Sequence, residues 1–152
     1  MTDSEYMKIA LEQAKLAYEK DEVPVGALVV KDNKIISKAY NLRENKKSPL
    51  AHAEVLAIEK ACKKLKSWRL LDCAIYVTLE PCIMCAGLMH QARINKCIFG
   101  AYDKKAGALS SLYKIHEDNR LNHNFDSVGG VMENDCAKIL SDFFRNKRKN
   151  RV

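Results

Sequence analysis

The order in which helix-like and strand-like segments alternate is the feature that most constrains the fold of this chain. Apolar residues recur at helical spacing over residues 4–19, and Ser4 is the expected N-cap of that helix. Two β-rich segments follow, 27–31 and 34–40, with Asp32-Asn33 between them as a tight-turn signal. The first forty residues therefore predict a helix followed by a β-hairpin.

The rest of the chain continues this alternation. A polar loop at 41–50 is followed by a helix at 51–66, a strand at 73–79, a short helix at 81–91 and a strand at 96–100. A long loop at 101–127, with some helix near 112–116, then leads to a strand at 128–132 and a last helix at 133–148. Strands that alternate with helices favour a mixed sheet covered on both faces. The sequence thus predicts an α/β fold, a three-layer α/β/α arrangement around a central mixed sheet of about five strands.

Composition sets the broad class of protein. Of the 152 residues, 47% are apolar and 30% are charged, which is typical of a soluble globular protein. No repeat or linker interrupts the pattern, so we expect a single domain over 1–152 that ends in a short basic tail at about 145–152. The first residues lack the pattern of a signal peptide, and no apolar run is long enough for a bilayer. We therefore expect a cytoplasmic protein that does not contact membranes.

The positive charge of the chain is unevenly distributed. The formal net charge is +7, and five of the last eight residues are basic, namely Arg145, Lys147, Arg148, Lys149 and Arg151. Further clusters occur at Lys46-Lys47 and at Lys63-Lys64-Lys66. Such clusters are either solvated faces or contacts for the phosphates of a nucleic acid.

The six cysteines do not have the same expected role. A core of this size needs no disulfides, so Cys62, Cys73 and Cys97, each among apolar neighbours, are expected to be buried as small apolar residues. Cys136 is expected either in the core or partly exposed. Cys82 and Cys85, by contrast, have the spacing of a pair of metal ligands.

Two short strings carry the chemistry, His52-Ala53-Glu54 and Pro81-Cys82-Ile83-Met84-Cys85. One imidazole and two thiolates, from His52, Cys82 and Cys85, make three ligands for tetrahedral zinc and leave the fourth position to water. Glu54, two residues from His52, is unsuited to a further ligand on the same helix face and suited to moving protons. The strings together match the signature of the zinc deaminases.

Other interpretations of these strings are a redox Cys-x-x-Cys pair, or a structural zinc site in an RNA-binding module. A redox pair leaves His52 and Glu54 without a role, and a structural site normally needs a fourth protein ligand. The remaining histidines, His90, His116 and His123, are not at ligand-like spacing. Catalytic zinc explains all four residues of the two strings.

A longer set of motifs includes the two strings and extends over nearly the whole chain, at 23–27 (Val-Pro-Val-Gly-Ala), 51–54, 76–87, 99–103, 105–108 and 140–145. Together these segments resemble the bacterial tRNA-specific adenosine deaminases. The resemblance implies a cytidine-deaminase-like fold, one Zn²⁺ per subunit and a homodimer. It further implies deamination of adenosine to inosine at position 34 of a tRNA anticodon stem-loop, usually of an arginine tRNA, with release of ammonia.

The resemblance also implies residues that contact the substrate. Asn41 would hydrogen-bond the flipped purine, the Ala53 backbone would lie against the edge of the base, and Asp103 would lie near the nucleotide. Phe144 and Arg145 would touch the anticodon loop. Each has a plainer alternative: a turn residue for Asn41, a loop-stabilising carboxylate for Asp103, and core or solvated-tail positions for Phe144 and Arg145.

The chain departs from the family in two places. It lacks the proline expected soon after Asn41, and its basic tail is short. The nearest rival function is a deaminase of the same fold that acts on a free base or nucleotide such as guanine or deoxycytidylate. A partner subunit that depends on another chain is a weaker alternative, because Glu54 and all three candidate ligands are present.

Overall fold

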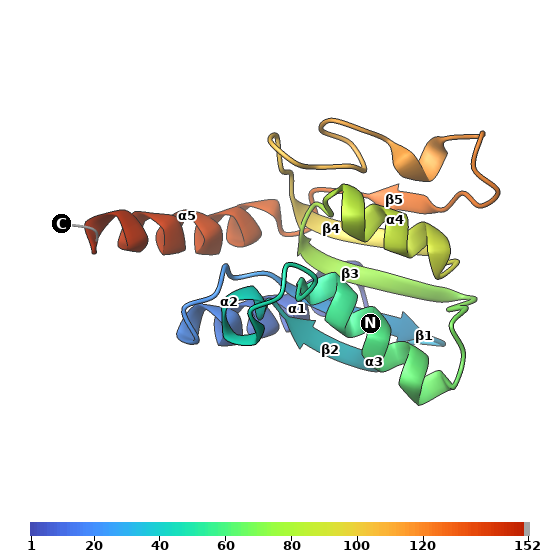
Figure 1. Cartoon of the computed structure of the whole chain (residues 1–152), viewed down its shortest axis with the longest axis horizontal. Helices are drawn as coiled ribbons and strands as arrows, with labels where there is room; N and C mark the ends of the chain where they lie inside the picture. Colours follow the sequence, from blue (N-terminus) through green and yellow to red (C-terminus); the bar gives the residue numbers. More distant parts are fainter. Residues whose placement is uncertain (151–152) are drawn as a thin grey trace.

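A five-stranded mixed sheet organises the structure, a computed structural model that describes residues 1–150 (Figure 1). The strand order is β2-β1-β3-β4-β5, with β1 antiparallel to both of its neighbours and β3, β4 and β5 mutually parallel. The strands are β1 (Gly26–Lys31), β2 (Lys34–Tyr40), β3 (Cys73–Leu79), β4 (Lys96–Ala101) and β5 (Asp126–Val128). The predicted α/β fold with a mixed sheet is confirmed.

Helices lie on both faces of this sheet and make the other two layers (Figure 1). Helices α1 and α5 pack on one face, and α3 and α4 cover the other. The helices are α1 (Asp3–Glu19), α2 (Arg43–Lys46), α3 (Ala53–Leu65), α4 (Ile83–Gln91) and α5 (Glu133–Lys149), with a 3₁₀ turn, η1 (Ile115–Glu117). None of the helices in residues 1–150 combines the length and the apolar character needed to cross a bilayer.

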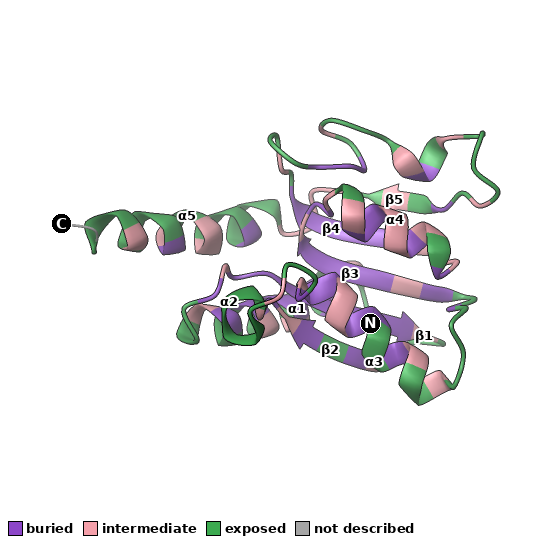
Figure 2. Ribbon diagram, in the orientation of Figure 1, coloured by how far each residue is buried: buried purple, intermediate pink, exposed green. Residues whose placement is uncertain are grey.

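Alternation along the strands divides the core into two halves. Successive strand side chains point to opposite faces; in β3, Val77 packs toward α3 and α4, whereas Tyr76 packs toward α1. Both sets are buried, so the central strands are covered on both sides (Figure 2). Helix α5 differs: Figure 2 shows it exposed along much of its length, with Cys136 and Phe143 as its buried residues.

The structure confirms the hairpin and corrects two terminal details. Asp32 and Asn33 both have positive φ, as a two-residue hairpin turn requires. Ser4 is not the N-cap of the first helix: Thr2 is, and its side chain accepts a hydrogen bond of 3.2 Å from the Glu5 N–H. The last strand is Asp126–Val128 and not 128–132: Gly130, with φ +85°, breaks the extended backbone, although the Gly130 and Val131 N–H groups still donate to the Gly100 and Phe99 carbonyls of β4 at 3.1 and 3.3 Å.

Two further segments differ from expectation. The loop expected at 41–50 contains the short helix α2, whose four residues include none that is buried. In the long connection before β5, the expected helix near 112–116 is the 3₁₀ turn at Ile115–Glu117. All six cysteines are free thiols; Cys73, Cys97 and Cys136 are buried, whereas Cys62 is half-buried.

Candidate active site and metal centre

Two helix N-termini meet beyond the carboxyl end of β3. His52 is the N-cap residue of α3 and Cys82 is the N-cap residue of α4, so both precede their helices, which begin two residues later than the expected ranges 51–66 and 81–91. Neither side chain caps its own helix. Cys85 lies in the first turn of α4 and is fully buried. The three side chains are therefore free to point toward one another.

The distances among the three side chains suit a zinc ion. The Nδ1 atom of His52 lies 3.6 Å from the Cys85 Sγ and 3.9 Å from the Cys82 Sγ. Zinc bonds of about 2.1 Å to nitrogen and about 2.3 Å to sulfur at tetrahedral angles place such atoms about 3.6 Å apart. The geometry and the donor set, one imidazole and two thiols, both fit zinc.

The site has three candidate ligands in the described part of the chain. His52, Cys82 and Cys85 form the group whose ligand atoms all lie within 4.8 Å of one another, and no further His, Cys, Asp or Glu of residues 1–150 joins it. Glu54 lies outside this group, as its spacing from His52 predicts. Three ligands and a neighbouring carboxylate match an open, reactive site better than a closed structural one.

The surroundings of the two thiols shift their pKa values in opposite directions. A hydrogen bond from Cys85, together with His52, lowers the pKa of Cys82 to about 3. The same hydrogen bond to Cys82 is the main cause, and burial the second, of a pKa of Cys85 above its ordinary value. The hydrogen bond to Cys82 is the main cause of the raised pKa of His52. The site thus stabilises a thiolate at Cys82, the form that binds metals.

Glu54 is the buried carboxylate of the site. Its side chain is 4% exposed, and burial raises its pKa to about 7 despite the opposing effect of His52. Glu54 also lines the cavity that opens over His52 and Cys82. A carboxyl group with a pKa near neutrality is able both to accept and to return a proton at physiological pH.

The cavity over the metal centre has a volume of about 970 Å³. Of the five substrate contacts implied by the resemblance, Asn41, Asp103 and Phe144 line it. Ala53 is fully buried, and its N–H donates to the Asn41 Oδ1 at 2.7 Å. This contact fixes the amide plane of Asn41, so Ala53 orients a cavity side chain from beneath.

Arg145 is placed differently from its neighbours on α5. Its guanidinium pairs with Asp142 at 3.2 Å, and it is not among the residues that line the cavity. Phe144 lines the cavity and is 44% exposed, which excludes the core position considered for it. Two other residues of the basic tail, Lys147 and Arg148, also line the cavity.

Part of the cavity rim was not expected from the sequence patterns. Besides Lys147 and Arg148, the cavity is lined by Arg43, Lys104 and Lys105. These last three belong to none of the charge clusters described above; they lie close in sequence to Asn41 and Asp103, and Lys105 also begins the matching segment 105–108. With five cations, the rim is strongly basic.

A second buried carboxylate, Glu80, holds the loop that carries Asp103 and the two lysines. Its oxygens accept hydrogen bonds from the backbone N–H groups of Asp103, Leu109, Ser110 and Ser111, at 2.8–3.2 Å, and from the Ser111 hydroxyl at 2.5 Å. Asp103 in turn accepts from the N–H groups of Lys105 and Ala106. The loop-stabilising role considered for Asp103 is therefore present, alongside its position on the cavity.

Comparison with known proteins places the chain in a family. The profile of the MafB19-like deaminases matches residues 1–148. The tRNA-specific adenosine deaminase of Bacillus subtilis is 48% identical over 152 residues, covering 99% of this chain and 94% of that one. Its counterpart from Aquifex aeolicus is 48% identical and covers 95% of both chains.

Solved structures agree with the sequence comparisons. A structure described in studies of A-to-I editing by tRNA:A34 deaminases superposes with a TM-score of 0.86 at 39% identity, covering 90% of this chain and 99% of that one. A guanine deaminase from Bacillus subtilis superposes with a TM-score of 0.64 at 38% identity over 67% of this chain and 66% of its own. On the strength of the extended matches, the chain belongs to the family of tRNA-specific adenosine deaminases.

Proposed function

We propose that this protein hydrolyses adenosine to inosine at the wobble position, 34, of a tRNA anticodon, with release of ammonia. Two full-length relatives, 48% identical to this chain, are tRNA-specific adenosine deaminases. The metal centre supports hydrolytic deamination in general. The choice of a tRNA over a free base rests on the cavity rim.

The reaction needs one zinc ion per subunit, held by His52, Cys82 and Cys85. When bound, zinc supplies a Lewis acid that makes water a strong nucleophile near neutral pH. Glu54 accepts the proton of the attacking water and delivers it to the ring nitrogen beside the amine-bearing carbon. Glu54 then takes the second water proton from the hydroxyl group now on that carbon and gives it to the amine, so the C–N bond breaks, ammonia leaves and the carbonyl of inosine forms.

Asn41 is the residue that we assign to binding the purine. Its Oδ1 is held by the Ala53 N–H at 2.7 Å, which leaves the Nδ2 to donate to an acceptor nitrogen of the base. Asp103 and Phe144 contribute to the wall around the nucleotide. Arg145 is assigned to the outer contact with the anticodon loop, beyond the cavity itself.

The basic rim is the observation that carries the choice of substrate. Arg43, Lys104, Lys105, Lys147 and Arg148 surround a cavity whose reactive groups lie at its floor. Several cations around one opening suit a substrate with phosphates on both sides of the target base, as in an anticodon loop. A base in a loop is also already partly unstacked, which lowers the cost of flipping it into the site.

The second candidate is a guanine deaminase, because a protein of that activity is 38% identical over two thirds of this chain. The comparison covers less of the chain than the match to the tRNA:A34 deaminase, which spans 90%. A free base carries no phosphates, so the five cations described at the rim would have no anionic group of the substrate to contact.

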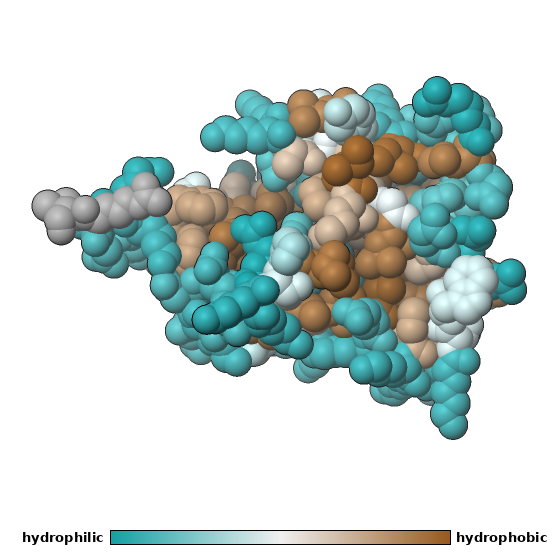
Figure 3. Space-filling view, in the orientation of Figure 1, coloured by the Kyte–Doolittle hydropathy of each residue, from teal (hydrophilic) through white to brown (hydrophobic). Residues whose placement is uncertain are grey.

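We further propose a homodimer that works in the cytoplasm, where an arginine tRNA is the substrate to test first. Figure 3 shows apolar side chains gathered over α3 and α4, and Leu50 and Ile83, near the starts of these helices, are each 58% exposed. A second copy would cover such a patch. Sedimentation of the wild type and of Ile83→Glu tests this: a monomeric wild type would contradict the homodimer.

The substrate assignment is tested by incubating the zinc-loaded protein with an anticodon stem-loop bearing adenosine at position 34, with free adenosine and with guanine. Inosine is expected in the stem-loop. A matched stem-loop with adenosine moved to a neighbouring position is the control and should not react. Faster conversion of guanine than of the stem-loop would favour the second candidate.

A further inference from the structure

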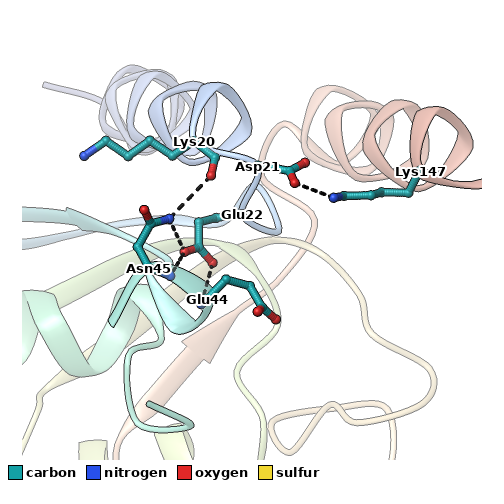
Figure 4. A network of polar contacts seen from close by, with 6 residues as sticks. All are labelled: Lys20, Asp21, Glu22, Glu44, Asn45 and Lys147. Atoms are coloured by element: carbon teal, nitrogen blue, oxygen red, sulfur yellow. Dashed lines mark hydrogen bonds and ion pairs between the residues drawn. The ribbon is translucent and has the colours of Figure 1, made fainter. Parts of the chain in front are cut away.

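Glu22 is a buried carboxylate that the proposed reaction does not use. It lies in the turn between α1 and β1, and it is 2% exposed. No lysine, arginine or histidine of residues 1–150 forms an ion pair with it. Three N–H donors satisfy it instead: the Glu44 backbone at 3.1 Å, the Asn45 backbone at 2.7 Å and the Asn45 side chain at 2.6 Å (Figure 4).

These donors belong to the exposed N-terminal turn of α2. The first N–H groups of any helix lack partners within the helix, and a side chain at the N-cap position commonly supplies one. The N-cap residue of α2 is Leu42, which has no side-chain acceptor. The carboxylate of Glu22, 22 residues away in sequence from Glu44, therefore caps α2 from another element of the fold.

Helix α2 has little apart from this cap to hold it in place. It has four residues, too few for a helix that is stable by itself, and none of them is buried. Apolar packing therefore cannot fix its position. In Figure 4 the only protein contacts drawn to Asn45 come from the Lys20–Glu22 turn, with the Lys20 carbonyl accepting at 3.4 Å.

The position of α2 matters because of the residues beside it. Arg43, its first residue, lines both the cavity over the metal centre and a neighbouring pocket of about 520 Å³ that reaches Glu22. Phe144 and Lys147 of α5 line the same two spaces from the other side. Lys147 also pairs with Asp21, the neighbour of Glu22, at 2.5 Å (Figure 4).

We propose that Glu22 is a positioning residue for the substrate entrance: by capping α2, it fixes Arg43 opposite Phe144 and Lys147. This proposal rests on the proposed function, because it assigns the gap between α2 and α5 to a polynucleotide. Glu22 touches neither the substrate nor the reacting atoms. Its loss should therefore weaken substrate binding and leave the chemical step intact.

The test compares Glu22→Gln with Glu19→Gln, an exposed carboxyl group in the last turn of α1. For both variants, zinc content, kcat and KM are measured with the stem-loop that carries adenosine at position 34, together with amide hydrogen exchange. The glutamine variant at position 22 should raise KM about tenfold and change kcat less than about twofold, because a charged acceptor of several hydrogen bonds is lost. The Glu44 and Asn45 amides should exchange faster, and those of β3 should not change.

Asn45→Ala is the second variant, in case Glu22→Gln does not fold. It removes one of the three donors and leaves both backbone N–H groups, so the same changes are expected at smaller size. Unchanged KM and unchanged exchange at residues 43–46 in both variants would overturn the proposal. A kcat that falls in step with zinc content would overturn it too, since Glu22 would then support the fold in general. If the wild type leaves the stem-loop unreacted, the proposed function is wrong, and the exchange data still decide whether Glu22 caps α2.

Discussion

The candidate metal centre and the rim of the cavity are held in place by different forces. The metal-centre residues begin α3 and α4, helices whose apolar faces are buried in the core against the sheet. Besides Lys147 and Arg148 of α5, the rim includes α2, which buries no residue, and the 103–111 loop. These two segments are held by backbone hydrogen bonds to the buried carboxylates of Glu22 and Glu80.

Catalysis and substrate choice therefore depend on different interactions: apolar burial under the candidate metal centre, and hydrogen bonds to buried carboxylates at the rim. Because the apolar faces of α3 and α4 are buried against the sheet, the floor of the cavity is rigid, and the candidate ligands at the starts of these helices keep their positions. A polar clamp fixes a surface segment without covering it, so the segment stays available to a large substrate. Changes at the floor should abolish the reaction, whereas changes at the rim should alter binding.

The largest effect is expected from Cys85→Ala at the floor. Loss of one of three ligands should release the metal and reduce activity to background, because two protein ligands hold zinc poorly. Metal content by mass spectrometry and turnover on the stem-loop measure this. Full zinc occupancy in the variant would show that the ligand set is wrong.

Glu54→Gln should separate chemistry from metal binding. The amide still holds water by hydrogen bonding but does not accept its proton, so kcat should fall by about 10²- to 10⁴-fold with zinc retained. Single-turnover kinetics on the stem-loop and metal analysis are the measurements. Near-normal turnover would remove Glu54 from the mechanism.

Deletion of residues 146–152 tests the rim at α5. It removes Lys147 and Arg148 from the cavity, together with Lys149 and with Arg151, which lies outside the described residues. Affinity for the stem-loop should fall about tenfold or more at low salt, and the slope of log K against log salt should become shallower by up to about 3. Zinc should be retained, and Lys34→Ala, which removes an exposed cation at the start of β2, should behave as wild type. Equal affinity with and without the tail at every salt concentration would end this assignment.

Gly107→Ala tests the rim at Glu80. A Cβ at position 107 would overlap the Glu80 carboxylate, whereas a Cβ at Gly87 on α4 meets nothing within 4 Å. The first variant should lower the free energy of unfolding by about 1–3 kcal/mol and raise KM several-fold. Gly87→Ala, the matched control, should be neutral or slightly stabilising. Equal thermal stability of the two variants would contradict the close packing around Glu80.

The smallest effect is the pH dependence contributed by Glu22. Burial by itself raises the pKa of Glu22, but the hydrogen bonds from Asn45 and Glu44 outweigh it and hold the pKa below its ordinary value of 4.5. A folded pKa below the unfolded one stabilises the protein above about pH 4.5, and this contribution disappears as the pH falls through the folded pKa. The difference in unfolding free energy between wild type and Glu22→Gln should therefore shrink between about pH 6 and about pH 3. A constant difference would mean that the charge of Glu22 is not what stabilises α2.

Most of the helices and strands, and the candidate reactive residues, could be predicted from the amino-acid sequence alone. Strands and helices are indicated by apolar side chains that recur with periods of two and of about 3.6 residues. The structure reproduces most of the predicted elements within a few residues. The candidate ligand set was also recognisable in the sequence, because Cys82 and Cys85 are three positions apart and His52 completes a group of three residues that could hold a metal ion. The spacing of the two cysteines is local, whereas His52, 30 residues from Cys82, was assigned through the match to the zinc-deaminase signature and not through local geometry.

Only the tertiary structure decided how the rim is built. Leu42 gives no capping signal, and Glu22 and Glu80 contact N–H groups more than twenty residues away, so no local pattern pairs them with α2 or with the 103–111 loop. The docking of α5 likewise selected Lys147 and Arg148 for the cavity and turned Arg145 toward Asp142. Neighbouring residues of a helix point in different directions, so composition shows that a tail is basic, but only packing shows which of its cations face the site.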